Sequence, residues 1–170
     1  KLAVGEYMTQ NCPNDPNCTL GGVYGWPINS WCVSNVTDMS YLFSGSGFND
    51  NISSWDVSNV TNMAGMFQYT YAFAGDISQW DVSNVVNMSY MFYYAYAFNG
   101  ELMRWNTSSV SNMNGMFLYA TSFNQNLCSW AESFPYGSAV GIFTSSNCMF
   151  TAHPDSDMRG PFCASNCTAE

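Results

Sequence analysis

Residues 52–63 read Ile-Ser-Ser-Trp-Asp-Val-Ser-Asn-Val-Thr-Asn-Met, and residues 77–88 read Ile-Ser-Gln-Trp-Asp-Val-Ser-Asn-Val-Val-Asn-Met. The tryptophans of these stretches belong to a longer series with spacings of 24, 25, 25 and 25 residues. The series is Trp31, Trp55, Trp80, Trp105 and Trp130. A fixed period of this length is the signature of a repeat architecture.

Further columns of apolar residues repeat with the tryptophans. They are Ile28, Ile52, Ile77, Leu102 and Leu127; Val36, Val60, Val85 and Val110; Met39, Met63, Met88 and Met113; and Phe43, Phe67, Phe92 and Phe117. A unit of this size cannot bury its own apolar face. We therefore predict that the units stack and that each column becomes a continuous apolar ladder in the core.

The pattern within one unit predicts its local structure. Residues 52–57 alternate apolar and polar side chains in part, which is typical of a short half-buried strand. Val60, Met63 and Phe67 then fall at helical spacing, which indicates a short helical turn within residues 59–67. The sequence thus predicts an α/β repeat solenoid, in which each coil has a short strand and a short helical turn and disulfides staple both ends.

The repeats divide the chain into three parts. Residues 1–23 are an N-terminal extension or cap, residues 24–147 the repeat solenoid, and residues 148–170 a cysteine-rich C-terminal cap. The repeat units are 24–47, 48–72, 73–97, 98–122 and a degenerate 123–147.

Composition narrows the function classes. The chain of 170 residues is 47% apolar and only 9% charged, and its formal net charge is -9. With only three Lys and Arg against twelve Asp and Glu, the chain has few cations to neutralise phosphates. This argues against nucleic acid and anionic membranes as partners. No apolar run approaches the roughly 20 residues of a membrane helix, so we predict no membrane insertion. His153 is the only histidine and the repeat accounts for its own carboxylates, so we predict no enzymatic activity and no cofactor.

The cysteines favour an oxidising compartment and disulfides. They are Cys12, Cys18, Cys32, Cys128, Cys148, Cys163 and Cys167. A zinc site that includes Cys163 and Cys167 is the alternative, but neither end of the chain has metal-ligand spacing. We expect the pairs Cys128–Cys148 and Cys163–Cys167 and one pair among the first three cysteines, which leaves one odd thiol. The predicted location is extracellular, either secreted or at the cell surface.

Residues 52–63 and 77–88 resemble the repeat of BspA-like surface proteins, a family related to leucine-rich-repeat proteins. The resemblance extends over residues 24–147, and the cysteine-rich tail resembles the closing segment of microalgal members. It implies a leucine-rich-repeat-like solenoid, surface display, and adhesion or scaffolding without enzymatic activity. The fourth unit departs from the pattern, because Asn106 replaces the aspartate and Ser109 replaces the asparagine of the repeat.

Two polar columns accompany the apolar ones. Asp56 and Asp81 share one column, and we predict that they cap turns by accepting a backbone N–H two or three residues on. A ladder of calcium sites is the functional alternative for this column. Asn59 and Asn84 belong to the second column, which we predict to be a buried hydrogen-bond ladder that Ser109 weakens in the fourth unit.

Several asparagines begin an Asn-x-Ser or Asn-x-Thr sequon for glycosylation. Those in repeat columns serve the fold, so we expect the acceptors to be the asparagines that the repeat does not explain. They are Asn17, Asn51, Asn106 and Asn166.

Tyrosines form a column on the loop after each expected helical turn. Tyr69, Tyr94 and Tyr119 align, and Tyr71, Tyr93 and Tyr96 lie nearby in the sequence. Tyrosine combines an apolar ring with a polar tip and is enriched at interfaces. The column has two interpretations, packing between coils and a face for assembly or ligand binding.

Two function hypotheses follow. The first is a structural subunit of a head-to-tail filament or surface assembly, a homopolymer of this chain. Residues 1–8 have the partial alternation of a strand, so we expect Leu2, Val4 and Tyr7 to lie against the last coil of a neighbouring copy. The second is a monomeric adhesin or ligand-binding module with residues 1–23 folded back as a cap. Its tyrosine-rich face would bind glycans or other surface proteins.

Overall fold

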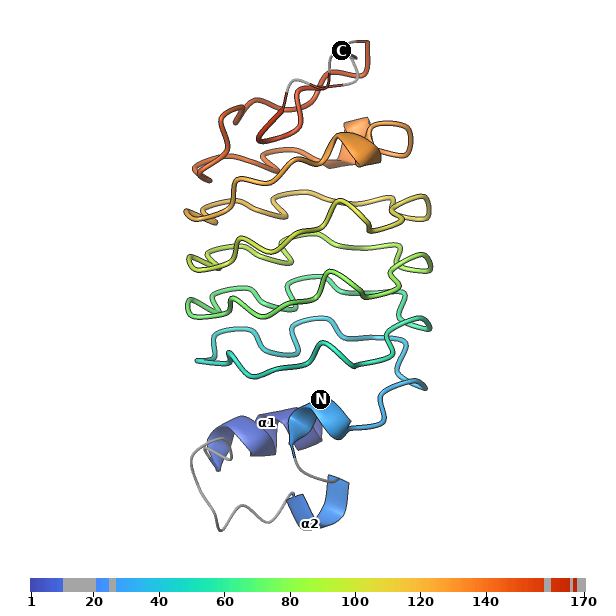
Figure 1. Ribbon diagram of the computed structural model, residues 1–170, viewed down its shortest axis with the longest axis vertical. Helices are drawn as coiled ribbons and strands as arrows, with labels where there is room; N and C mark the ends of the chain where they lie inside the picture. The colour runs from blue at the N-terminus through green and yellow to red at the C-terminus, as the bar shows by residue number, and fades with distance from the viewer. Residues whose placement is uncertain (11–20, 25–26, 158–159, 166, 168–170) are drawn as a thin grey trace.

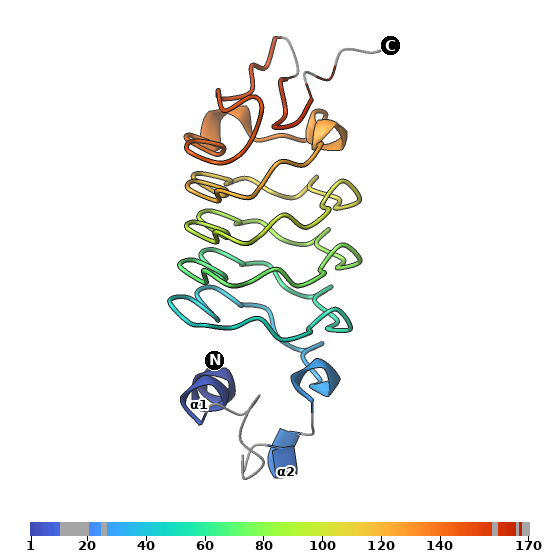
Figure 2. The ribbon, with the colours of Figure 1, turned by 60° about the vertical axis from the view of Figure 1, so that its left-hand side comes forward.

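The computed structural model describes residues 1–10, 21–24, 27–157, 160–165 and 167. It contains the helices α1 (Leu2–Thr9) and α2 (Gly21–Tyr24) and the 3-10 turns η1 (Ile28–Ser30), η2 (Cys128–Trp130) and η3 (Tyr136–Ser138). Figure 1 and Figure 2 show the repeats as flat coils stacked along one axis, with both helices at the N-terminal end. We call residues 28–147 the coil stack. No helix among the described residues is both long and apolar enough to cross a membrane.

The coil stack is not the α/β repeat solenoid, leucine-rich-repeat-like or otherwise, that the sequence predicts. Across residues 27–157 the backbone forms turns, bends and single bridges, with no α-helix and no strand longer than one bridge residue. The parallel bridges join Asp38 to Asn62, Asn62 to Asn87 and Asn87 to Asn112. The strand expected over residues 52–57 and the helical turn expected over residues 59–67 are therefore both wrong.

The coils form no helix because many of their backbone N–H groups donate hydrogen bonds to a neighbouring coil. In the second coil, the N–H groups of Gly65 and Phe67 donate to the carbonyl oxygens of Ser89 and Met91 in the next coil, at 2.8 and 2.9 Å. The N–H of Gln68 instead donates to the carbonyl of Gly65, three residues earlier, at 3.0 Å. A helix would send every N–H to the carbonyl four residues earlier. The apolar spacing that resembles a helical face arises here from successive turns.

These turns place a residue in the left-handed backbone region at a fixed position in each coil. Gly65 and Gly115 occupy it with φ of 58°, and Tyr90 occupies it in the coil between them with φ of 56°. The ring of Tyr90 also lies over Gly115, because a Cβ placed on Gly115 would be 2.5 Å from Cε1 of Tyr90. Both the backbone conformation and the neighbouring ring thus favour glycine at position 115.

We expect Gly115→Ala to lower the free energy of unfolding by about 2 to 4 kcal/mol. A side chain in the left-handed region costs about 1 to 2 kcal/mol, and the contact with Tyr90 adds an overpacking cost of about 1 to 3 kcal/mol. Urea denaturation measures the change, and Gly47→Ala is the control because a Cβ at Gly47 meets nothing within 4 Å. Equal stability of the two variants would contradict the close approach of Tyr90.

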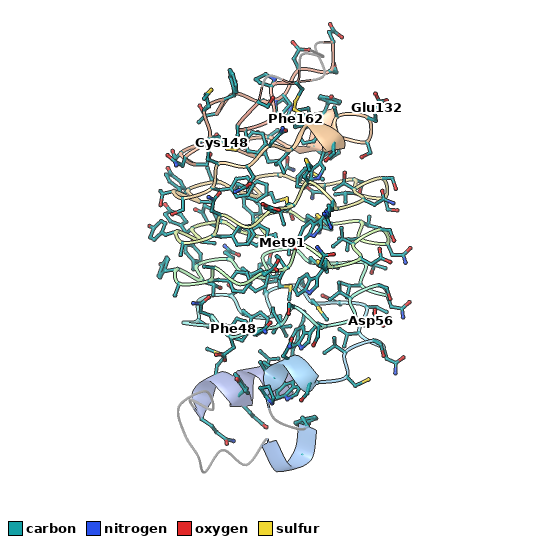
Figure 3. The ribbon with its side chains drawn as sticks, in the orientation of Figure 1. Phe48, Asp56, Met91, Glu132, Cys148 and Phe162 are labelled. Atoms are coloured by element: carbon teal, nitrogen blue, oxygen red, sulfur yellow. A yellow bond between two sulfur atoms is a disulfide. The ribbon has the colours of Figure 1, made fainter. Side chains whose placement is uncertain are left out.

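The tryptophan, methionine and phenylalanine columns line the core, which confirms the predicted inward register. Trp80 is 4% exposed and Phe92 is fully buried. The indole Nε1–H of Trp80 donates to the carbonyl of Ile52 in the preceding coil at 3.2 Å, so the ring both fills the core and ties two coils together. Figure 3 shows Met91 in the middle of the stack and Asp56 at its edge.

Helix α1 covers the N-terminal end of the coil stack. The sequence predicts a strand here, and that prediction is wrong because Leu2–Thr9 is helical. Val4 and Tyr7 are buried, and the ring of Tyr7 meets Trp31 edge-on at a centroid distance of 5.5 Å. The Tyr7 hydroxyl donates to the carboxylate of Asp50 at 2.8 Å. These contacts hold α1 on the first coil of its own chain.

The C-terminal segment closes the other end of the stack with disulfides. They join Cys128 to Cys167 and Cys148 to Cys163, with Cα–Cα distances of 5.4 and 4.5 Å. The expected pairing of Cys128 with Cys148 and of Cys163 with Cys167 is therefore wrong. Phe162 is fully buried beside this pair of disulfides, so the segment also adds to the core.

Cys32 carries a free thiol. It is exposed, and its Sγ lies 3.5 Å from Oγ of Ser34. The sequence predicts one odd thiol, and Cys32 is the free one among the cysteines that the structure describes. Cys12 and Cys18, for which a pairing is expected, lie outside the described residues.

Candidate functional site

Six tyrosines of the second, third and fourth coils gather where the run of inter-coil hydrogen bonds ends, and the N–H groups of Tyr69, Tyr94 and Tyr119 donate the last of these bonds. We call them the tyrosine face: Tyr69, Tyr71, Tyr93, Tyr94, Tyr96 and Tyr119. Contacts between rings join all of them into one cluster. The tyrosine column that the repeat defines is therefore continuous in space.

The rings form two stacks that meet edge-on, and one further ring packs against the longer stack. Tyr94 stacks on Tyr69 at a centroid distance of 5.2 Å and on Tyr119 at 4.6 Å. Tyr71 and Tyr96 form the second stack at 5.1 Å. Tyr93 meets Tyr94 edge-on at 4.5 Å, which is a favourable aromatic geometry. The face is therefore ordered by its own ring contacts.

The backbone of this column is unusual for tyrosine. Tyr69, Tyr94 and Tyr119 have φ of 57°, 57° and 58°, in the left-handed region. A residue other than glycine at such a position costs about 1 to 2 kcal/mol. Gly45 occupies the same position in the first coil with φ of 69°, so the turn itself does not require a tyrosine.

The outer rings of the face are accessible. Tyr71 is 52% exposed, Tyr96 41% and Tyr119 37%. The pKa of Tyr93 is raised, first by its hydrogen bond with Tyr69 and then by burial. Burial and the neighbouring phenols also raise the pKa of Tyr96. Both hydroxyls keep their protons at neutral pH and can donate hydrogen bonds, so the surface combines apolar ring edges with neutral polar tips.

Residues 21–132 match a family described as "Mycoplasma protein of unknown function, DUF285". The chain belongs to this family. The DUF285 match includes the whole tyrosine face and the first four coils. No curated protein and no solved structure matches the chain.

The aspartate column of the DUF285 repeats caps turns, as the sequence predicts. Oδ1 of Asp56 accepts the N–H of Ser58 at 3.1 Å, and Oδ1 of Asp81 accepts that of Ser83 at 3.0 Å. The hydrogen bonds from Ser58 lower the pKa of Asp56. Among the described residues, no three His, Cys, Asp or Glu side chains group in a way that could hold a metal ion.

The asparagine column is a hydrogen-bond ladder, but it is exposed rather than buried. Nδ2 of Asn84 donates to the carbonyl of Ser58 in the preceding coil at 2.8 Å. In the fourth unit, Oγ of Ser109 donates to the carbonyl of Ser83 at 2.6 Å. The expectation that Ser109 weakens the ladder is therefore wrong, because its hydroxyl replaces the amide donor.

The other residues singled out from the sequence lie apart from the tyrosine face. Asn51 and Asn106 are exposed, so the structure leaves both open to glycosylation, which stays a prediction. Asn17 and Asn166, and the side chain of Leu2, lie outside the described part of the structure.

His153 packs against the last coil. One ring nitrogen lies 3.1 Å from the carbonyl oxygen of Ala139, and the other lies 2.7 Å from that of Tyr136. These contacts attach the C-terminal segment to the coil stack, which gives this histidine a structural role.

Sequence reasoning missed one neighbour of the face. Tyr90 meets Tyr93 edge-on at 5.7 Å and so extends the cluster. Tyr90 shares its repeat column with Gly65 and Gly115. A column that contains both glycine and tyrosine indicates a left-handed backbone position, and this signal could have identified Tyr90 from the sequence.

Proposed function

We propose that the protein is a non-enzymatic extracellular module that binds a macromolecular partner through the tyrosine face. The observation that supports this most strongly is the left-handed backbone of Tyr69, Tyr94 and Tyr119. Gly45 fills the same position without a side chain, so tyrosine is kept there at a cost to the backbone. Strained positions of this kind cluster at sites that bind ligands.

Two observations support an extracellular location. The disulfides Cys128–Cys167 and Cys148–Cys163 are typical of proteins from oxidising compartments. Membership of the DUF285 family agrees with the resemblance of residues 52–63 to the repeat of BspA-like surface proteins. We infer that the protein is secreted or displayed at the surface.

The chemistry of the face favours an uncharged partner. The net charge of -9 repels polyanions, and the face itself offers neutral phenols. Exposed tyrosine rings can contact the C–H groups of sugars through their faces, while the hydroxyls exchange hydrogen bonds with sugar hydroxyls. A neutral polysaccharide is therefore the partner that we propose.

We expect Tyr71→Ala/Tyr96→Ala to bind neutral polysaccharide at least about tenfold more weakly than the native protein, because the contact loses two aromatic anchors. Both rings are exposed, at 52% and 41%, so their removal takes contact surface from the face with little loss of core packing. Depletion isotherms on particles of cellulose, chitin and a β-1,3-glucan measure the binding.

The matched control is Val86→Ala/Met103→Ala. Its two side chains are 45% and 55% exposed and lie outside the tyrosine face, so binding should equal that of the native protein. Native protein that binds none of the three solids would rule out a neutral polysaccharide of these types as the partner. Equal binding by native protein and the tyrosine variant would exclude the tyrosine face as the binding surface.

Head-to-tail assembly into a filament or surface layer is the second candidate function. It is favoured by exposed apolar side chains at the two ends, namely Val23 on α2 at 70% and Met149 after the fifth coil at 72%. Light scattering over a range of concentrations separates the two candidates. A constant monomer mass would rule out assembly, and a mass that grows with concentration would support it.

A further inference from the structure

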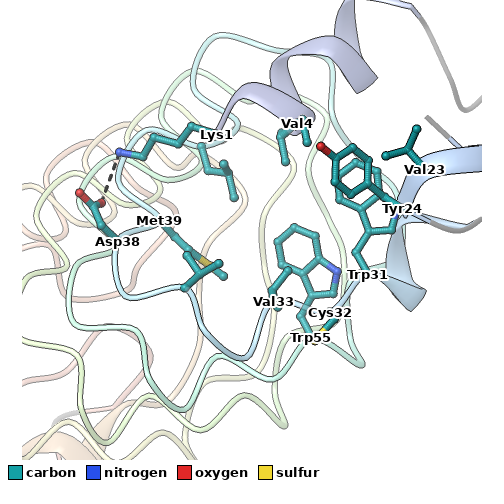
Figure 4. Close-up of a pocket in the computed structure, with 13 residues that line it drawn as sticks. Lys1, Val4, Val23, Tyr24, Trp31, Cys32, Val33, Asp38, Met39 and Trp55 are labelled. Carbon is teal, nitrogen blue, oxygen red and sulfur yellow. Dashed lines mark hydrogen bonds and ion pairs between the residues drawn. The ribbon is translucent and has the colours of Figure 1, made fainter. Parts of the chain in front are cut away.

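A cavity of about 370 Å³ lies between the N-terminal helices and the first coil. Figure 4 shows Val4 of α1, Tyr24 of α2 and Met39 of the first coil around this space. None of its lining residues belongs to the tyrosine face. The cavity is therefore a separate feature of the molecule, at one end of the coil stack.

The cavity exists because the apolar columns end at the first coil. Val60 and Met66 of the second coil are fully buried, since coils lie on both sides of them. Their counterparts Val36 and Leu42 in the first coil are only partly buried and line the cavity. Helices α1 and α2 take the place of a preceding coil, but they cover the ends of the columns only in part.

Aromatic side chains dominate one part of the lining. The rings of Tyr24 and Trp31 lie 5.2 Å apart at an interplanar angle of 40°, and Trp55 also lines the space. The thioether of Met39 is a further lining group. Flat aromatic molecules make favourable contacts with both kinds of group.

The charged groups at the cavity are paired with each other. Nζ of Lys1 lies 3.3 Å from Oδ1 of Asp38 and donates to Oγ of Ser40 at 2.8 Å. A charged ligand would lose its hydration and compete with this pair. Water in the apolar part would lack the polar partners that it needs. An uncharged apolar ligand has no charge to dehydrate and needs no polar partners, so it fits this cavity better than an ion or water.

We propose that this cavity is a binding site for a small, uncharged aromatic molecule of one or two fused rings. Its volume falls toward the lower end of the range of about 300 to 1,000 Å³ that is typical of ligand pockets. The rings of Tyr24, Trp31 and Trp55 supply faces and edges for a planar guest. An aliphatic chain of the same volume would fill the space without using these rings.

Isothermal titration with 1-naphthol tests the site, and we expect saturable binding of one molecule per chain. Ala3→Phe fills the cavity from α1 and Val36→Phe fills it from the first coil, so each should weaken binding at least about tenfold. Val86→Phe introduces the same ring at a position that is 45% exposed and remote from the cavity. This control should bind 1-naphthol as the native protein does.

Cys32 gives a second readout in the native protein, because its free thiol lines the cavity. Saturating 1-naphthol should slow the reaction of Cys32 with N-ethylmaleimide, as followed by peptide mapping. Tyr71→Ala/Tyr96→Ala should bind 1-naphthol normally, which keeps this test independent of the proposed polysaccharide binding. The proposal is overturned by an absence of saturable binding, by unchanged Cys32 reactivity at saturation, or by tighter binding of the uncharged aliphatic alcohol 1-octanol than of 1-naphthol.

Discussion

Replacing Trp80 with alanine is expected to lower the free energy of unfolding by about 3 to 5 kcal/mol. The indole is 4% exposed in the middle of the stack, and its ring lies 6.4 Å from that of Phe67. Its Nε1–H donates to the carbonyl of Ile52 at 3.2 Å. The variant loses packing on both sides and one of the two hydrogen bonds that the Ile52 carbonyl accepts, so the two losses act in the same direction.

Urea denaturation of native protein and variant measures this difference. Gln79→Ala is the matched control, because Gln79 precedes Trp80 in the chain and is exposed. Its effect should stay within about 0.5 kcal/mol. Equal effects at the two positions would mean that the tryptophan column does not line the core.

Removal of the disulfide between Cys148 and Cys163 by Cys148→Ala/Cys163→Ala is expected to lower the free energy of unfolding by about 3 kcal/mol. The bond closes a loop with a sequence separation of 15, and a loop of that length contributes about this amount through the unfolded chain. Cys148 is 7% exposed and Cys163 fully buried, so the lost sulfur contacts add to the effect.

Cys32→Ala is the control for this measurement, because Cys32 is exposed and free. We expect its unfolding midpoint in urea to match that of the native protein. A double variant that unfolds at the native midpoint would show that the C-terminal segment is not part of the cooperative unit.

The stacking of the repeats and the identity of the core could be predicted from the sequence, but the local structure could not. The spacing of Trp55 and Trp80 fixes which residues lie in register, whatever the backbone does between them. Val60, Met63 and Phe67 fit a helical period, and the same spacing also results from successive turns. The difference depends on hydrogen bonds to another coil, such as that from Phe67 to Met91, which no local pattern contains.

The disulfide pairing could not be predicted from the sequence either, because it depends on the path of the C-terminal segment in space. Four cysteines allow three pairings, and proximity in the chain favours the wrong one. The C-terminal segment runs back over the fifth coil, where Cys163 bridges to Asn126. This path brings Cys163 to Cys148, and the sequence alone does not specify it.

The tyrosine face was predicted in outline only. The column of Tyr69, Tyr94 and Tyr119 follows from the repeat period, but its left-handed backbone does not, because tyrosine rarely adopts that conformation. Gly45 in the same column was the available clue. A column that mixes glycine with one other residue type indicates a left-handed position in repeats of this kind.

Scalar couplings across hydrogen bonds, measured by NMR on the isotope-labelled protein, test the coil stack most directly. Couplings are expected from the amide nitrogen of Gly65 to the carbonyl carbon of Ser89, and from that of Tyr69 to that of Tyr93. These bonds set the register that places the tyrosines side by side. A coupling from Gly65 to the carbonyl of Thr61, four residues earlier, would instead reveal a helix and contradict both the coil stack and the tyrosine face.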